Sequence, residues 1–274
     1  MDDIEFNDKK QIINYGNRFY RGTHYDVNGV LLANVKGTTY EPAINGLLLL
    51  DSLGNHIGYT NEDIENIGGE GVYIHERDIQ PGDVVIDAGA FIGDFSAYAA
   101  FKGATVYAFE PSKKTFKWLE KTAELNPSIH PVPMGLSNEC KTVRLFRYKH
   151  YNGMDTTDFK RVIEYIFFTP GSLRYPIKTI SPFFNSDKIK VITLDKFVSD
   201  NDIYRIDFIK VDIEGNERYM LMGATNVLKT MAPELSICTY HLPDDPEVIR
   251  EVIMKANPNY KIVQKKKKLH AWVP

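Results

Sequence analysis

The chain has few cysteines, the residues that form disulfides and structural zinc sites. Only two of its 274 residues are cysteine, and no C-x-x-C pair is present. This content fits a reducing compartment and argues against a disulfide framework or a structural zinc site. The longest apolar run, around Leu47–Leu50, is far too short to cross a bilayer, and the acidic first residues lack the apolar core of a signal peptide. We therefore expect a cytoplasmic protein without a membrane span.

A large charge of either sign is also missing. Lysine and arginine number 33 against 36 aspartates and glutamates, which gives a net charge of -3. This balance gives no reason to expect binding to nucleic acid or to an anionic membrane surface. The one basic run, Lys265–Lys268, could contact phosphates, but a lysine-rich hairpin tip more often protects an edge strand.

Two segments differ in texture from the rest of the chain. Residues 1–78 contain short strands and turns, with a hairpin signal at Asn28–Gly29 and a second turn at Gly54–Asn55. They predict a β-rich N-terminal extension or cap. Residues 143–190 are rich in aromatic side chains and have no clean period. We expect an insertion there on the acceptor side, whose aromatics either stack on a sugar or form a secondary core.

The remaining residues, within 79–274, alternate between apolar strands and helices. Strands are predicted at 84–90, 104–111, 129–137, 206–213 and 233–241, with a terminal hairpin over 260–273. Helices are predicted at 94–103, 112–126, 217–231 and 246–257. Continuous apolar strands that alternate with helices predict an α/β fold with a parallel sheet covered on both faces.

The first strand-to-helix turn has the features of a nucleoside site. Gly89 removes a side chain from the turn, and Gly93 permits tight helix–strand packing before the next helix begins. Glu110 ends the following strand, where a carboxylate can accept both hydroxyls of a ribose. A dinucleotide site needs glycine two residues after the first, but Phe91 stands there and would crowd a pyrophosphate. The pattern therefore favours S-adenosylmethionine over NAD.

Three acids cluster where the strand at 206–213 ends: Asp212, Glu214 and Glu217. Burying a carboxylate without a partner is costly. At the carboxyl end of a parallel strand, however, Asp212 would lie beside the cationic sulfonium and amino groups of the ligand. We expect Glu217 at the start of the next helix, where the dipole favours an acid, and Asp207 at the opposite edge of the sheet.

His241 ends the next strand at the same edge. An imidazole among acids is a candidate general base for removing the proton of an alcohol during methyl transfer, and Asp212 is the alternative. A metal site made of Asp212, Glu214 and His241 is conceivable, because hard oxygen ligands would meet an imidazole. No spacing specifically supports it, so no metal is predicted.

Several motifs together resemble the FkbM-type S-adenosylmethionine-dependent methyltransferases. They are "VVIDAGAFIGDFS", "VYAFEP", "VITLDKF", "IDFIKVDIEGNERYMLMGA" and "PELSICTYH", and they extend over Gly82–His241. The resemblance implies a class I methyltransferase (Rossmann-like) fold, a doubly wound mixed sheet of seven strands with the last antiparallel. It also implies S-adenosyl-L-methionine as cofactor and O-methylation of a hydroxyl on a sugar, a glycan or a related natural product.

The resemblance further implies which residues form the site. The implied cofactor-binding residues are Asp87, Gly89, Ala90, Phe91, Gly93, Glu110, Pro111, Leu136, Ser137 and Asp212. The implied catalytic residues are Asp212, Glu214 and His241. One departure matters: the family commonly has asparagine where this chain has Phe91, so one polar contact of the loop is lost.

Three alternative functions stay open. The first is an NAD-dependent nucleotide-sugar or alcohol oxidoreductase on the same fold, which Phe91 disfavours. The second is a nucleic-acid methyltransferase that would use Lys265–Lys268. The third is a scaffold that keeps the fold without turnover. Assembly into a homo-oligomer is open as well.

Overall fold

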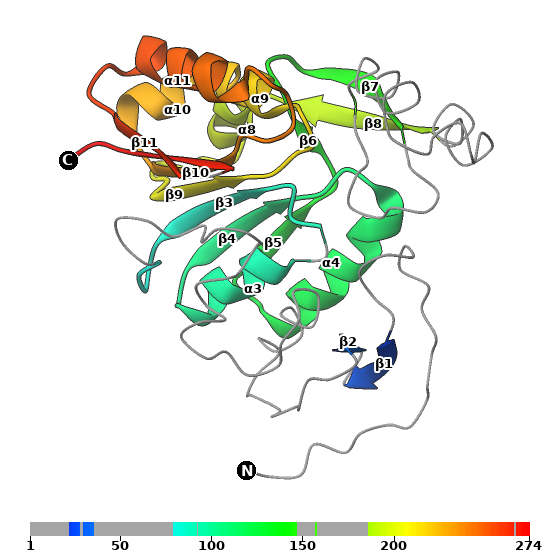
Figure 1. Ribbon diagram of the computed structural model, residues 1–274. Helices are drawn as coiled ribbons and strands as arrows, with labels where there is room; N and C mark the ends of the chain where they lie inside the picture. Colours follow the sequence, from blue (N-terminus) through cyan, green and yellow to red (C-terminus); the bar gives the residue numbers. More distant parts are fainter. Residues whose placement is uncertain are drawn as a thin grey trace.

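The computed structural model describes residues 22–27, 30–35, 79–91, 93–146, 157, 186–265 and 267–274. Its centre is a seven-stranded sheet with the order β11-β12-β10-β9-β3-β4-β5 (Figure 1). The strands are β3 Val84–Ala88, β4 Thr105–Phe109, β5 Ile129–Val132, β9 Phe208–Val211, β10 Glu234–Cys238, β11 Lys261–Lys265 and β12 Lys268–Trp272.

The direction of the strands confirms the predicted mixed sheet. β3, β4, β5, β9 and β10 run parallel, whereas β12 lies antiparallel between β10 and β11. The order reverses at β3, which pairs with β4 on one side and β9 on the other. In open α/β sheets, ligands bind beyond the carboxyl ends of the strands at such a switch point.

Helices cover both faces of this sheet. They are α3 Asp94–Phe101, α4 Lys113–Leu125, α8 Leu194–Asp200, α9 Glu217–Met222, α10 Thr225–Thr230 and α11 Asp245–Ala256. Helices α3 and α4 lie on one face, and α8 to α11 lie on the other (Figure 1). Consecutive residues of β3 point to opposite faces of the sheet. Val85 packs with α3 and α4, while Ile86 packs with the helices on the other face. This explains why the strands read as unbroken apolar runs.

The helix predicted over 217–231 is wrong in one respect, since the structure divides it into α9 and α10. Gly223 ends α9, and a Cβ added to it would lie 2.1 Å from the carbonyl oxygen of Ser137. That close approach leaves no room for a side chain. The break therefore lets α9 lie against the segment that follows β5.

A second, three-stranded sheet has the order β6-β8-β7. Its strands are β6 Gly135–Leu136, β7 Lys141–Phe146 and β8 Ser186–Ile192. The strand predicted over 129–137 is thus two strands, β5 and β6. The two ends of the predicted insertion pair antiparallel as β7 and β8, with Phe146 opposite Ser186, and its extent stays a prediction. Apart from residue 157, its middle lies outside the described residues.

The N-terminal hairpin predicted at Asn28–Gly29 is confirmed. β1 Gly22–Val27 and β2 Val30–Val35 pair antiparallel, with Val27 opposite Val30. The turn predicted at Gly54–Asn55 and the boundary after residue 78 lie outside the described residues, so the division into an extension and a main domain stays a prediction. In the part of the chain that is described, no helix has the length and apolar character needed to cross a membrane.

Candidate active site

The glycine turn after β3 lies directly against the end of β9. Gly89 has a φ of 77°, and a Cβ added to it would lie 1.9 Å from the carbonyl oxygen of Asp212. The N–H groups of Gly89 and Ala90 both donate to the carbonyl oxygen of Phe109, at 3.1 and 2.9 Å. Backbone contacts therefore join the ends of β3, β4 and β9, and these two N–H groups already have acceptors within the protein.

Glu110, at the end of β4, holds the same turn. Its Oε2 accepts a hydrogen bond from the N–H of Phe91 at 3.1 Å, and its Oε1 accepts one from the N–H of Ser112 at 2.8 Å. A carboxylate oxygen can accept more than one hydrogen bond, so these contacts leave Glu110 able to accept hydroxyls of a ribose. The binding of a ribose by Glu110 stays a prediction.

Phe91 adopts a φ of 54°, in the left-handed region. Asparagine tolerates this conformation well, whereas an aromatic residue with a Cβ does so at a cost. This gives a physical reason for the asparagine that the family commonly has at this position. The departure from the family pattern at Phe91 therefore strains the backbone as well as removing a polar side chain.

Asp87 supports the turn from within the core, and it is fully buried. Its Oδ2 accepts a hydrogen bond from Ser96 Oγ at 2.6 Å, and its Oδ1 lies 3.0 Å from Lys210 Nζ. Lys210, on β9, also donates to the carbonyl oxygen of Gly89 at 2.7 Å. Asp87 thus helps to position the turn through Lys210, and its predicted contact with the cofactor stays a prediction.

Gly93 allows close packing, although against a helix and not against a strand as predicted. A Cβ added to Gly93 would lie 2.9 Å from side-chain atoms of both Leu119 and Thr122, which belong to α4. Gly93 is also the N-cap of α3, with a φ of 97°. It therefore lets the start of α3 approach α4.

The remaining predicted cofactor residues lie beside the end of β4. A Cβ added to Gly135 would contact Pro111 Cγ at 3.7 Å. Leu136 and Ser137 are buried, and the carbonyl oxygen of Leu136 accepts a hydrogen bond from Asn216 Nδ2 at 2.7 Å. The segment is thus placed where an adenine-bordering turn would be needed, and that role stays a prediction.

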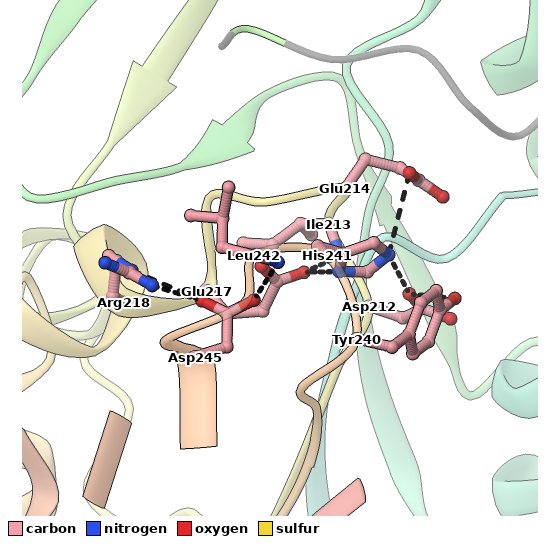
Figure 2. A network of polar contacts seen from close by, with 9 residues as sticks. All are labelled: Asp212, Ile213, Glu214, Glu217, Arg218, Tyr240, His241, Leu242 and Asp245. Atoms are coloured by element: carbon pink, nitrogen blue, oxygen red, sulfur yellow. Dashed lines mark hydrogen bonds and ion pairs between the residues drawn. The ribbon is translucent and has the colours of Figure 1, made fainter. Parts of the chain in front are cut away.

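The acids after β9 meet His241 after β10, as Figure 2 shows. His241 Nε2 lies 3.5 Å from Asp212 Oδ1 and 3.6 Å from Glu214 Oε2. On the other side of the ring, Nδ1 lies 2.8 Å from Glu217 Oε1. The side chains of His241 and Glu217 are completely buried, while those of Asp212 and Glu214 are 23% and 17% exposed. The cluster is thus buried at His241 and Glu217 and partly open to solvent at Asp212 and Glu214.

Electrostatics in this cluster are strong. Burial alone would lower the pKa of His241, but the charge of Glu217 and the interactions with Glu214 outweigh burial and raise this pKa to about 10. Burial, together with the charge of Asp212, raises the pKa of Tyr240. The phenol therefore stays protonated and can donate to Asp212 Oδ1, which lies 3.3 Å from its oxygen.

The backbone around the acids is also unusual. Glu214 has a φ of 55° and Gly215 a φ of 97°, so two consecutive residues are left-handed. Such strain is concentrated at functional sites, where the surrounding structure enforces it. Here the N–H of Ile213 donates to Glu217 Oε1 at 2.9 Å, which fixes the loop that carries Asp212 and Glu214.

An ion-pair network fixes the segment that follows His241. Arg218, on α9, donates to Asp244 Oδ1 and Asp245 Oδ1, each at 2.7 Å. Asp245 in turn accepts a hydrogen bond from the N–H of Leu242 at 2.7 Å. These contacts, of which Figure 2 shows those made by Asp245, tie the start of α11 to α9 and set the position from which His241 enters the cluster.

The three predicted catalytic residues are therefore brought together. Asp207 lies at the opposite edge, as predicted, since its Oδ2 accepts the N–H of Val84 at the start of β3. Glu217 does begin α9, but the expectation of a simple helix-terminal acid was incomplete because it contacts His241. Lys210 was missed; a lysine inside the apolar strand "FIKV" was the available signal, since a buried lysine needs a partner.

The sheet order and the acids at its carboxyl edge define a class I methyltransferase type of domain. Residues 87–261 match the model of the "Methyltransferase FkbM domain" family, and the chain belongs to this family. This confirms the resemblance on which the methyltransferase fold and the S-adenosylmethionine-dependent class were predicted. The predicted contacts of individual residues with the cofactor or the acceptor stay predictions.

Curated relatives and a solved structure agree with this assignment. The chain is 26% identical over 183 residues to the hexuronic acid methyltransferase AglP of Haloferax volcanii, covering 66% of each chain. It is 27% identical over 161 residues to the 31-O-demethyl-FK506 methyltransferase FkbM of Streptomyces tacrolimicus, covering 54% of this chain and 62% of that one. The crystal structure of methyltransferase FkbM from Methylobacillus flagellatus KT shares the fold, with a TM-score of 0.50, 19% identity, and coverage of 72% of this chain and 45% of that one.

Proposed function

We propose that this protein is an S-adenosylmethionine-dependent O-methyltransferase that modifies a hydroxyl of a sugar, a glycan or a related natural product. The observation that carries the proposal is the shared edge of the sheet. Glu110 at the end of β4 and the cluster of Asp212, Glu214 and His241 after β9 and β10 lie at the carboxyl ends of neighbouring parallel strands. This is the edge at which the fold binds its ligands.

The residues present fit the cofactor. Glu110 would accept the ribose hydroxyls while it holds the turn at Phe91, and the segment 135–137 beside Pro111 would border the adenine. Asp212 would face the methionine end, where a partly exposed carboxylate compensates a positive sulfonium. Lys210 and Asp87, which are buried in the sheet, would keep Gly89 in place.

When bound, S-adenosylmethionine supplies the methyl group, whose carbon bonds to the acceptor oxygen as its bond to sulfur breaks and S-adenosylhomocysteine is left. The protein's part is to align the acceptor, exclude water and receive the proton of the hydroxyl. The side chain of His241 is fully buried and has a carboxylate beside each ring nitrogen, whereas the carboxylate of Asp212 is partly exposed. Asp212 is therefore the group proposed to take it, held in place by Tyr240 and His241.

The acceptor class rests on the relatives. One is named for a hexuronic acid and the other for 31-O-demethyl-FK506, so both names point to acceptors with an oxygen that can be methylated. The chain spans two thirds or less of these relatives, so the acceptor is carried over as a class and not as a compound. A panel of uronic acids, their glycosides and macrolide alcohols follows from this reasoning.

The test begins with calorimetric titration of the protein with S-adenosylmethionine, S-adenosylhomocysteine and NAD. We expect binding of the two adenosyl ligands and none of NAD. The acceptor panel is then incubated with S-adenosylmethionine that carries a trideuterated methyl group. Mass spectrometry of the products shows which acceptor has gained the labelled methyl group. A preference for NAD, or a methyl group found on nucleic acid and on no hydroxyl of the panel, would overturn the proposal.

A further inference from the structure

Neither ring nitrogen of His241 makes a hydrogen bond of normal geometry among the described residues, although Nδ1 lies close to Glu217. The other nitrogen, Nε2, belongs to a side chain with no exposed surface. It points between two carboxylates, at 3.5 Å from Asp212 Oδ1 and 3.6 Å from Glu214 Oε2 (Figure 2). Both distances are too long for hydrogen bonds. They are close to the roughly 3.0–3.5 Å that separates two neighbouring ligand atoms on one metal ion.

The opposite ring nitrogen is held in the manner of a metal-binding histidine. Glu217 Oε1 lies 2.8 Å from Nδ1, and the same oxygen accepts the N–H of Ile213. A carboxylate on one ring nitrogen fixes the orientation of the ring, and a metal that binds the other nitrogen displaces the proton carried there. The possible ligand atoms of Asp212, Glu217 and His241 lie within 4.8 Å of one another. Glu214 is outside this group, and its Oε2 lies 3.6 Å from Nε2. Because Glu217 already serves Nδ1, we assign it to orientation and assign Nε2 to the metal.

The charge of the cluster gives a separate reason. Three carboxylates lie around one imidazole in a largely buried place. Partly buried charges need compensation, and a divalent cation is the largest local charge that such a site can acquire. The strained, left-handed backbone at Glu214 places that side chain beside Nε2 in spite of its cost.

We propose that Asp212, Glu214 and His241 Nε2 bind a divalent cation of the oxygen-preferring class, Mg²⁺ or Mn²⁺, while Glu217 orients the imidazole. Two carboxylates and one imidazole suit this class of ion, and the partly exposed carboxylates leave positions for water or an acceptor. No metal was predicted from the sequence, because the sequence does not show that Glu217 reaches the far side of the ring.

The use of the cation rests on the proposed function. A hydroxyl bound to a divalent cation gives up its proton more readily, so the acceptor oxygen would become a better nucleophile. Its proton would pass to the oxygen of Asp212 that the cation leaves free. The binding of the cation itself does not depend on the acceptor and can be tested alone.

The experiment is a titration of the EDTA-treated full chain with Mn²⁺, followed by electron paramagnetic resonance of the free ion, with Mg²⁺ as competitor. We expect one Mn²⁺ per chain. Glu214→Gln and His241→Phe should each abolish uptake, and Glu217→Gln should weaken it about ten- to a hundredfold. Asp200→Asn removes an exposed acid of α8 and should bind Mn²⁺ like the native chain.

Thermal unfolding of each variant shows whether it is folded, and Glu214→Gln keeps the test valid if His241→Phe does not fold. No uptake by the native chain at millimolar Mn²⁺, or equal uptake by Glu214→Gln, would overturn the cation site. Calorimetry with S-adenosylmethionine on the same samples separates the two proposals. Cofactor binding without Mn²⁺ uptake removes the cation alone, whereas Mn²⁺ uptake without cofactor binding removes the proposed function alone.

Discussion

The two halves of the carboxyl edge are built in different ways. On the β3 and β4 side, backbone groups make most of the contacts, and a single carboxylate, Glu110, receives two N–H groups. On the β9 and β10 side, charged side chains contact one another around His241. The first arrangement depends on chain geometry and suits a ligand common to a whole family. The second depends on the identity of a few side chains and suits the chemistry of one reaction.

The largest expected effect comes from breaking the buried pair that connects the halves. Lys210→Met leaves the fully buried Asp87 without its cation and removes the hydrogen bond to Gly89. We expect a loss of about 3–5 kcal/mol in the free energy of unfolding, measured by urea denaturation. The exposed pair of Lys196 and Asp200 is the control, and Lys196→Met should leave the urea midpoint almost unchanged. Equal small shifts for both variants would show that the halves are not joined through Lys210.

A smaller effect is expected where the backbones of the halves touch. In Gly89→Ala, the new Cβ meets the carbonyl oxygen of Asp212 and the residue keeps a positive φ, so we expect a loss of roughly 2–4 kcal/mol. Gly82 has a similar φ of 86° but nothing within 4 Å of an added Cβ. Gly82→Ala should therefore cost only about 1–2 kcal/mol of strain. The difference in urea denaturation measures the contact, and no difference would contradict it.

The smallest effect concerns the cofactor half alone. Phe91→Asn and Phe91→Ala both remove the aromatic ring, but asparagine tolerates the left-handed backbone at this position better than alanine. We expect Phe91→Asn to be more stable than Phe91→Ala by about 1 kcal/mol in the same denaturation assay. If alanine proved the more stable of the two, the left-handed conformation at residue 91 would be wrong.

The sequence predicted the α/β sheet and its ligand-binding edge better than the side-chain contacts. Apolar strands that end in Gly89, Glu110 and Asp212 define an α/β sheet and its ligand-binding edge, because the carboxyl ends of parallel strands share one edge. The breaks were harder to predict. The helix over 217–231 has a continuous helical pattern, and only the packing of Gly223 against Ser137 shows why it divides.

The chemistry of the site was predicted only in part for a similar reason. Asp212, Glu214 and His241 stand at strand ends, where position in the chain implies proximity. Glu217 and Lys210 act through contacts across the fold, with Nδ1 of His241 and with Asp87, and no spacing in the sequence encodes those contacts. Their signals are single buried charges, which become informative only once a partner is located.

The most direct test of the account measures both halves at once, by S-adenosylmethionine calorimetry and by transfer of a trideuterated methyl group in native protein, Glu110→Gln and Glu214→Gln. The account predicts that Glu110→Gln weakens cofactor binding about ten- to a hundredfold, because a buried acceptor of ribose hydroxyls is lost. Glu214→Gln should bind the cofactor like the native chain and lose methyl transfer. Native cofactor binding by Glu110→Gln, or native methyl transfer by Glu214→Gln, would contradict the division of the edge into a cofactor half and a reaction half.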